Sequence, residues 1–209
     1  MALNERPAGR ETASLPALPY VSPEILLAEN AEETDVASLS RKLAQDPSLT
    51  ARIVSAANSA AFSGQGAIRS IDEAVMRLGL NRLRVLATSI LLRNQFDPSR
   101  CPGFQAARYW QHAIATASTA ARLSRAGGLD PAPAELAGLL HSIGVLLLAH
   151  ALPELMDTMF RRHRANPEGT LGPLLREELG VDHHQAGAML LREWELPTSV
   201  CDLVAELSR

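Results

Sequence analysis

The residues of this sequence best suited to metal or acid–base chemistry are its six histidines, and one of them stands in an unusual place. His141 lies in "LLHSIG", residues 139–144, on an almost wholly apolar stretch, and Ser142 follows it directly. Imidazole and carboxylate side chains hold metals together, whereas a neutral hydroxyl is a poor ligand at neutral pH. His141 is therefore either part of a metal site that has lost its carboxylate or a buried neutral histidine, hydrogen-bonded to a backbone carbonyl or to Ser142.

No other catalytic pattern is present in the sequence. It contains no glycine-rich phosphate loop, no Ser/His/Asp arrangement and no cysteine-rich metal cluster. Cys101 and Cys201 form no CxxC pair, which favours a reduced, intracellular protein. The first residues, "MALNERPAGRETAS", include no apolar run and so predict no secretory signal. Together these features predict a cytoplasmic protein.

Composition and charge narrow the classes of partner. A chain of 209 residues forms one domain or two small ones that share a core, and 46% hydrophobic with 21% charged residues is ordinary for a globular protein. The net charge of −3 argues against sequence-independent nucleic-acid binding. Arg82 and Arg93 share one helical face, but Arg84 does not, so the arginines form no stripe. Nucleic acid is not an expected partner.

The elements that must position His141 are predicted to be helices. Leucine and alanine dominate while aromatic residues make up only 4%, a bias typical of helix-on-helix packing. Asp46 before Pro47 predicts a helix start, as do Ser70 with Glu73 and Asp182 with Gln185. No run alternates as a strand would. The sequence therefore predicts an all-α fold.

Breaks along the chain predict its organisation. Residues 1–14 are polar and patternless, which indicates a flexible segment. Gly79 predicts the end of one helix, and Asn81 predicts the cap of the next. "DPSRCPG", residues 97–103, predicts a junction between two helical halves. One apolar helix is expected from Pro133 or Ala134 to the proline at 153; its histidines, serine and glycines favour burial in protein over a membrane span.

Several stretches, taken in order, resemble the HDOD domain, a domain related to the HD phosphohydrolases that acts as a signalling output. They are "DPSLTARIVSAANSAAF" (46–62), "IRSIDEAVMRLGLNRLR" (68–84), "YWQHA" (109–113), "AGLLHSIG" (137–144) and "GVDHHQAGAMLLREWELP" (180–197). The resemblance implies that residues 15–209 form an HDOD domain, with an N-terminal helical bundle (15–96) packed on an HD-domain-like helical core (104–209). It also implies a bacterial protein that regulates rather than catalyses.

The resemblance assigns places to the site residues. His112 matches the first histidine of the HD pattern, His141 matches the histidine of the His-Asp pair, and Ser142 stands where the aspartate belongs. His183 matches a further ligand of related HD proteins, whereas Asp202 is no clear counterpart of their final aspartate. Magnesium and manganese are held largely by carboxylates, so these histidines predict a vestigial pocket with no metal and no cofactor. Three histidines could suit zinc if they converged, which their spacing does not show.

Other candidate residues have structural alternatives. Asn58, Ser59 and Phe62 belong to the most specific motif of the resemblance and are either a structural corner or an interaction surface. His150 and His184 are expected to be surface or capping groups. His163, in "RRHR" (161–164), is expected on a solvated helix end. The two tryptophans are expected to fill the core or a seam.

These observations predict a non-catalytic regulatory module that binds signalling proteins whose identity the sequence does not give. One alternative is a metal-dependent phosphohydrolase with an altered ligand set. Another is a sensor that binds a nucleotide or cyclic dinucleotide in the old pocket without cleaving it. Bound metal near His112 and His141 would favour the first alternative, and stabilisation by a nucleotide would favour the second.

Overall fold

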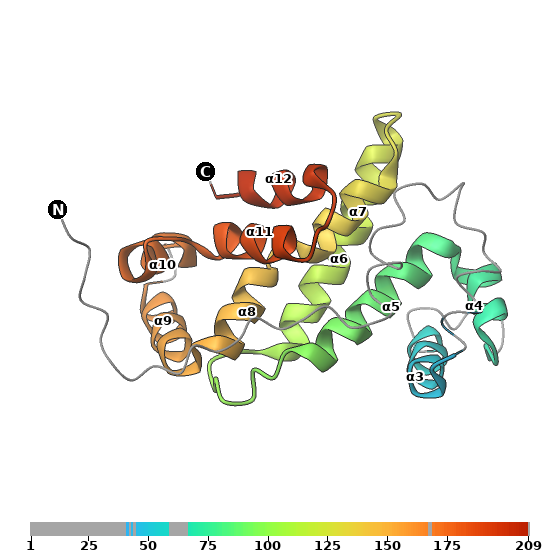
Figure 1. The fold of residues 1–209 in the computed structure, drawn as a ribbon, viewed down its shortest axis with the longest axis horizontal. Coiled ribbons are helices and arrows are strands. Elements are labelled where there is room, and N and C mark those ends of the chain that lie inside the picture. The colour runs from blue at the N-terminus through green and yellow to red at the C-terminus, as the bar shows by residue number, and fades with distance from the viewer. Residues whose placement is uncertain (1–40, 42, 44, 59–66, 167–168, 209) are drawn as a thin grey trace.

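A computed structural model describes residues 41, 43, 45–58, 67–166 and 169–208 of the chain (Figure 1). Every regular element within these ranges is an α-helix, which confirms the all-α prediction for the described part. The flexible segment predicted at 1–14 lies outside the described residues. In chain order the helices are α3 (Pro47–Ala57), α4 (Ile71–Leu78), α5 (Leu80–Gln95), α6 (Ala106–Ala126), α7 (Pro131–Leu140), α8 (Ile143–Ala151), α9 (Pro153–Ala165), α10 (Leu171–Leu179), α11 (His183–Glu193) and α12 (Thr198–Glu206).

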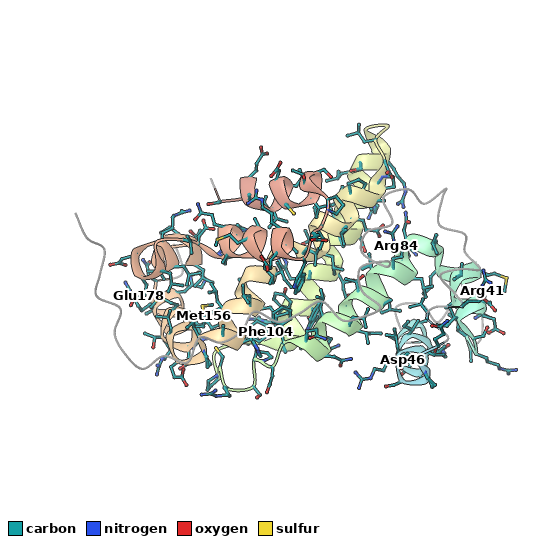
Figure 2. All side chains as sticks on the ribbon, in the orientation of Figure 1. Arg41, Asp46, Arg84, Phe104, Met156 and Glu178 are labelled. Atoms are coloured by element: carbon teal, nitrogen blue, oxygen red, sulfur yellow. The ribbon has the colours of Figure 1, made fainter. Side chains whose placement is uncertain are left out.

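Helices α3, α4 and α5 form a bundle at one end of the molecule (Figure 1). Their shared core consists of aliphatic side chains, among them the fully buried Ile53 and Leu83. The other helices build the larger half, in which α6 packs along α7 and α11 packs on α8 and α12. Met156 of α9, labelled in Figure 2, is fully buried in a core that α9 shares with α8 and α10. The arrangement is the predicted helical bundle on a larger helical core.

Helix α5 connects the two halves. Its first three turns contribute to the core of the small bundle, whereas Leu92 and Phe96 belong to the core of the large half. Trp110 and Trp194 are buried in that second core, as expected. Phe96 packs against Trp194 with ring centroids 6.1 Å apart. The seam between the halves is therefore largely apolar and aromatic on this side.

A polar patch completes the seam between α5 and α7. Glu135 is 5% exposed and Thr88 is 2% exposed, and with Arg84 they line a small cavity of about 20 Å³ (Figure 2 labels Arg84). Burial raises the pKa of Glu135, although Arg125, Arg82 and Arg84 oppose the shift. Burial likewise lowers the pKa of Arg84, against the attraction of Glu135 and Asp130. Arg84 is thus part of the seam and not of a surface stripe.

The helix starts show how far the capping signals hold. Asp46 accepts hydrogen bonds from the backbone N–H groups of Ser48 (2.9 Å) and Leu49 (3.0 Å), and Asp182 forms a complete capping box with Gln185. The prediction that Asn81 caps α5 was wrong. The helix begins at Leu80, two residues earlier than a cap at Asn81 would place its start, and the cap position is Gly79, whose φ of 79° suits a glycine.

The prediction of a single apolar helix around LLHSIG was also wrong, because the chain turns at His141 and Ser142 and forms two helices. Helix α7 begins at Pro131, where Asp130 accepts from the N–H of Ala132. The stretch Pro131–Ala151 is apolar and long enough to cross a membrane by length and composition, but most of it is buried within the protein. The break places His141 and Ser142 at a helix junction rather than in a helix interior.

Candidate functional site

The histidines of the sequence analysis come together from three places in the fold. Helix α6 supplies His112, the α7–α8 junction supplies His141 and Ser142, and the first turn of α11 supplies His183 and His184. The rings of His112 and His141 lie edge to face with centroids 5.0 Å apart. The rings of His183 and His184 lie 4.0 Å apart. We refer to these four imidazoles as the histidine cluster.

Three glycines permit this approach of helices. A Cβ on Gly138 would lie 2.9 Å from the Cα of Ala117, so α7 crosses α6 with backbones in contact. A Cβ on Gly144 would lie only 1.8 Å from the carbonyl oxygen of His183, a distance that no side chain can occupy. Gly187 faces Gly144 from α11 and makes the same contact from the other side. The first turns of α8 and α11 are therefore packed backbone to backbone.

Backbone carbonyls fix the tautomers of two histidines. The Nδ1 atom of His141 lies 2.8 Å from the carbonyl oxygen of Gly138, and Nδ1 of His184 lies 2.9 Å from the carbonyl oxygen of His141. A carbonyl only accepts, so both Nδ1 atoms carry hydrogen and donate. The lone pair of each neutral ring is then on Nε2. His184 caps the end of α7 in this way, as the sequence analysis expected of it.

Burial keeps the inner histidines neutral. Desolvation lowers the pKa of His183 to about 4, with a further contribution from His184 that Asp182 only partly offsets. Desolvation also lowers the pKa of His141, and the hydrogen bond to Gly138 only partly offsets it. The pKa of the nearby Tyr109 is raised by burial, so its hydroxyl stays protonated. At neutral pH this part of the cluster carries no positive charge.

Two polar atoms in the cluster have no hydrogen-bond partner among the described residues. They are Oγ of Ser142 and Nδ1 of His183, both fully buried. The Ser142 side chain lies near enough to Tyr109 to lower the pKa of the phenol slightly, but the two hydroxyls do not meet the distance and angle of a hydrogen bond. Ser142, at 9% exposure, thus occupies the place of a carboxylate without taking over its contacts.

The carboxylate nearest in sequence to His183, that of Asp182, bonds to groups outside the histidine cluster. Asp182 is 1% exposed, and its Oδ1 accepts from the N–H of Gln185 at 2.9 Å. Its Oδ2 accepts from the hydroxyl of Ser208 at 2.6 Å and forms an ion pair with Arg176. These hydrogen bonds lower the pKa of Asp182 despite its burial. Asp202 lies on α12 and pairs with Arg192 at 2.9 Å, so neither aspartate contributes to the cluster.

The donor set does not fit the divalent metal of an HD phosphohydrolase. Within the described ranges, no three His, Cys, Asp or Glu side chains are arranged to hold a metal ion. The cluster offers imidazoles alone, whereas hard cations such as magnesium and manganese require oxygen ligands with charge. No hydrolytic step can be derived for these residues through such an ion.

The predicted interaction motif is described only at Asn58. Its Nδ2 donates to the carbonyl oxygens of Val54 (2.9 Å) and Ile68 (2.7 Å), and its Oδ1 accepts from the N–H of Ile68 (2.6 Å). Asn58 therefore closes the connection between α3 and α4, in keeping with the structural alternative for this residue. Ser59 and Phe62 lie outside the described residues.

The remaining histidines lie away from the cluster. His150, near the end of α8, accepts from the N–H of Asp97 at 3.0 Å and packs edge-on against Phe96. It anchors the connection between the two halves. His163 is half-buried on the last turn of α9, and its Nδ1 has no hydrogen-bond partner among the described residues. His163 thus lies at the helix end where it was expected, with its ring only partly exposed.

Sequence reasoning missed two members of the site. Tyr109 precedes His112 by one turn of α6, and the double histidine at 183–184 places a second ring beside the first. The spacing of Tyr109 and His112 on one helix is a signal that could have pointed to the phenol. His184 carried no comparable signal, because its contact with His141 depends on how α11 meets α7.

This geometry defines an all-α, HD-like domain in which imidazoles from α6, the α7–α8 junction and α11 come together, with no carboxylate of the described residues among them. The sequence model of the HDOD domain matches residues 15–209, and the chain belongs to this family.

Solved structures resemble the chain closely. An HDOD domain protein of unknown function from Geobacter sulfurreducens is 27% identical with a TM-score of 0.79, over 93% of this chain and 65% of that one. A Marinobacter aquaeolei protein, provisionally named a signal transduction protein, is 30% identical with a TM-score of 0.79, over 91% of this chain and 43% of that one. A Shewanella amazonensis protein, provisionally named a phosphohydrolase, is 29% identical with a TM-score of 0.73, over 94% and 72%.

A relative from Treponema pallidum, named as an uncharacterized protein, is 27% identical over 198 residues. These residues are 91% of this chain but 37% of the relative. The chain thus spans less than two thirds of the length of both this relative and the Geobacter protein.

Proposed function

We propose that this HDOD domain is a non-catalytic regulatory module of a bacterial signalling pathway that acts in the cytoplasm by binding other proteins. The observation that carries the proposal is that none of the described carboxylates belongs to the histidine cluster. Ser142 stands where an HD protein has aspartate, and Asp182 is already bonded to Gln185, Ser208 and Arg176. A site of this kind lacks the charge that metal-dependent hydrolysis needs.

The neutrality of the cluster also speaks against phosphate binding in it. Burial holds His141 and His183 in their neutral form, so they offer a phosphate no attraction between opposite charges. The alternative of a nucleotide sensor that uses this pocket therefore has little support from the described residues. The provisional name of the Marinobacter relative, a signal transduction protein, agrees with the regulatory proposal.

A metal-dependent phosphohydrolase with an altered ligand set is the second candidate. The observation that favours it is the tautomer of His141, since donation from Nδ1 to Gly138 leaves Nε2 free to bind a metal such as zinc. The provisional name of the Shewanella relative points the same way. Against it stands the lack of a third converging ligand among the described residues.

Phosphatase and phosphodiesterase assays separate the two candidates. Purified protein would be tested on p-nitrophenyl phosphate and bis-p-nitrophenyl phosphate with manganese, magnesium, nickel, iron or zinc. We expect rates equal to those of His141→Ala with every metal, and elemental analysis without stoichiometric metal. Hydrolysis that depends on metal and disappears in His141→Ala would instead establish the phosphohydrolase.

A further inference from the structure

A groove lies between α3 and α5. These two helices belong to the small bundle at one end of the molecule, whereas α6, α7, α8 and α11, which form the histidine cluster, belong to the larger half (Figure 1). The groove is open to solvent and has a volume of about 720 Å³. Helix α3 lines it with Arg52, Ser55 and Ala56, and helix α5 lines it with Ile90, Arg93 and Asn94. The groove is large enough for a short peptide segment.

The two arginines are held at the groove by contacts that leave charge available. Arg52 donates from Nη1 to Oδ1 of Asn94 at 2.5 Å, a bond that joins the two walls. The guanidinium of Arg93 lies over the ring of Trp110, 5.8 Å from its centroid. Both contacts are with neutral groups, so they orient the guanidinium groups without neutralising them. A guanidinium held in place loses less entropy when it binds a carboxylate.

The charge of the groove comes from two arginines that lie at one site. At least five other arginines of the described chain form ion pairs with aspartate or glutamate. Arg52 and Arg93 have no carboxylate within ion-pair distance among the described residues, and none lines the groove. In a protein with net charge −3, this is a local positive site.

The floor between the arginines is apolar and nearly flat. Ala56 is half-buried, and Ile90 is 8% exposed. Small side chains on α3 let an extended or helical backbone approach closely, while Ser55 offers a hydroxyl at the rim. Recognition would therefore combine one or two apolar contacts with two charge-assisted hydrogen bonds.

We propose that the α3–α5 groove docks an acidic, partly apolar segment of a partner protein, with carboxylates on Arg52 and Arg93. This inference rests on the proposed function and names the chemistry of the partner. Arginine binds carboxylate through two parallel N–H donors, which fixes the direction of the docked segment. The histidine cluster takes no part in this contact.

Selection from a display library of random twelve-residue peptides tests the groove. The recovered peptides then serve as probes, and their affinities for the full chain are measured by fluorescence anisotropy. We expect peptides rich in aspartate and glutamate, with binding that weakens at least tenfold in Arg52→Glu/Arg93→Glu and falls with added salt.

The control Arg122→Glu/Arg164→Glu makes the same charge change on exposed arginines of α6 and α9 and should bind as the natural chain does. Ser55→Trp fills the groove without changing charge and should weaken binding as well, which keeps the test valid if the charge variant unfolds.

Several outcomes would overturn the proposal. These are peptides without acidic enrichment, equal affinity in all variants, or failure to recover any binder. Displacement of the peptides by millimolar inorganic phosphate would reassign the groove to a phosphate-bearing ligand. Tighter peptide binding after neutralisation of the five carboxylates in residues 24–35 would reassign it to that segment of the chain. If a partner protein bound equally well to the natural chain and to Arg52→Glu/Arg93→Glu, the proposed function would stand and the groove proposal would fail. Metal-dependent hydrolysis would overturn the proposed function alone.

Discussion

Individual residues of the histidine cluster show that nitrogen donors alone do not make a site for a hard cation. His141 presents a free Nε2, because its Nδ1 donates to the Gly138 carbonyl, and His112 lies beside it. What the pair lacks is negative charge, since Ser142 is neutral and Asp182 is bonded elsewhere. A single restored carboxylate should therefore change the chemistry of the cluster more than any added histidine.

Ser142→Asp tests this directly. The new carboxylate would lie next to His141 in a position that is 9% exposed, and we expect manganese or nickel to bind at least tenfold more tightly than to the natural chain. Without metal the buried charge should cost about 3 kcal/mol of folding stability. Isothermal titration calorimetry and urea unfolding measure the two effects. Ser142→Asn, with the same shape but no charge, should gain no affinity; equal gains in both variants would contradict the argument.

Asn58 is a second single residue with a testable role, in the stability of the fold. Its side chain makes three hydrogen bonds to backbone groups of Val54 and Ile68, so Asn58→Ala should lower the free energy of unfolding by about 2 kcal/mol. Asn58→Asp keeps the acceptor for the Ile68 N–H but sets a carboxylate oxygen against the carbonyl oxygens of Val54 and Ile68, so its loss should be at least as large. Urea unfolding of the three proteins checks the order. A change below 0.5 kcal/mol in Asn58→Ala would show that the connection closes without it.

At the scale of helices, the glycine contacts decide whether the cluster forms. Gly144→Ala would place a Cβ 1.8 Å from the carbonyl oxygen of His183, so α8 and α11 must separate. We expect a loss of more than about 3 kcal/mol, or failure to fold, measured by thermal and urea unfolding. Gly172→Ala is the matched control, because it lies in helix α10 and its Cβ would have no neighbour closer than 3.7 Å. It should be neutral or more stable by up to about 1 kcal/mol; similar losses in both would contradict the contact argument.

The helices also show what the sequence can and cannot predict. Starts set by local chemistry were predicted correctly at Asp46, Ser70 and Asp182, because a cap and its partner lie within one turn. The break at His141 and Ser142 was missed, because hydropathy runs on through it and nothing local marks it. Asn81 failed as a cap for a related reason: its side chain is drawn into the seam, where Oδ1 is buried.

The candidate site was predictable only in part. Resemblance selected His112, His141 and His183, and the structure brings their helices together, but spacing along the chain could not show this. Convergence depends on close backbone contacts at Gly138, between α7 and α6, and at Gly144, between α8 and α11, which arise only when these four helices pack. The groove on α3 and α5 was likewise hidden, since Arg52 and Arg93 are 41 positions apart and meet only when their helices pack.

For the whole molecule, the small bundle and the large half share one helix, α5, and a seam that is apolar on one side and polar on the other. Leu92 and Phe96 anchor α5 in the large core, and Arg84 faces Glu135 across the polar part. The proposed groove lies on α5 as well, on Ile90, Arg93 and Asn94, which are interleaved along the chain with the seam residues Leu92 and Phe96. A segment docked there would contact the helix that joins the halves.

The pH dependence of stability is a property of the whole fold with opposing contributions. His183 and His141 have pKa values below the ordinary 6.5, so the unfolded chain binds more protons than the folded chain as pH falls below 6.5. Their contribution is intact above pH 6.5 and is lost between 6.5 and about 4. Glu135 acts in the other direction, because its raised pKa favours the protonated folded state as pH falls toward 4.5. Asp182, with a lowered pKa, contributes stability that is lost only below pH 4.

His183→Gln isolates the largest of these terms. With a folded pKa of about 4 against 6.5 unfolded, His183 should lower the free energy of unfolding by about 2 kcal/mol between pH 7 and pH 5. The natural chain should therefore lose about 2 kcal/mol more over this interval than His183→Gln, as measured by urea unfolding at both pH values. The comparison cancels Glu135 and Asp182, which both proteins retain. If His183→Gln kept the pH dependence of the natural chain, the imidazole of His183 would have to be solvated in the folded protein, and the neutrality that argues against phosphate binding in the cluster would fail with it.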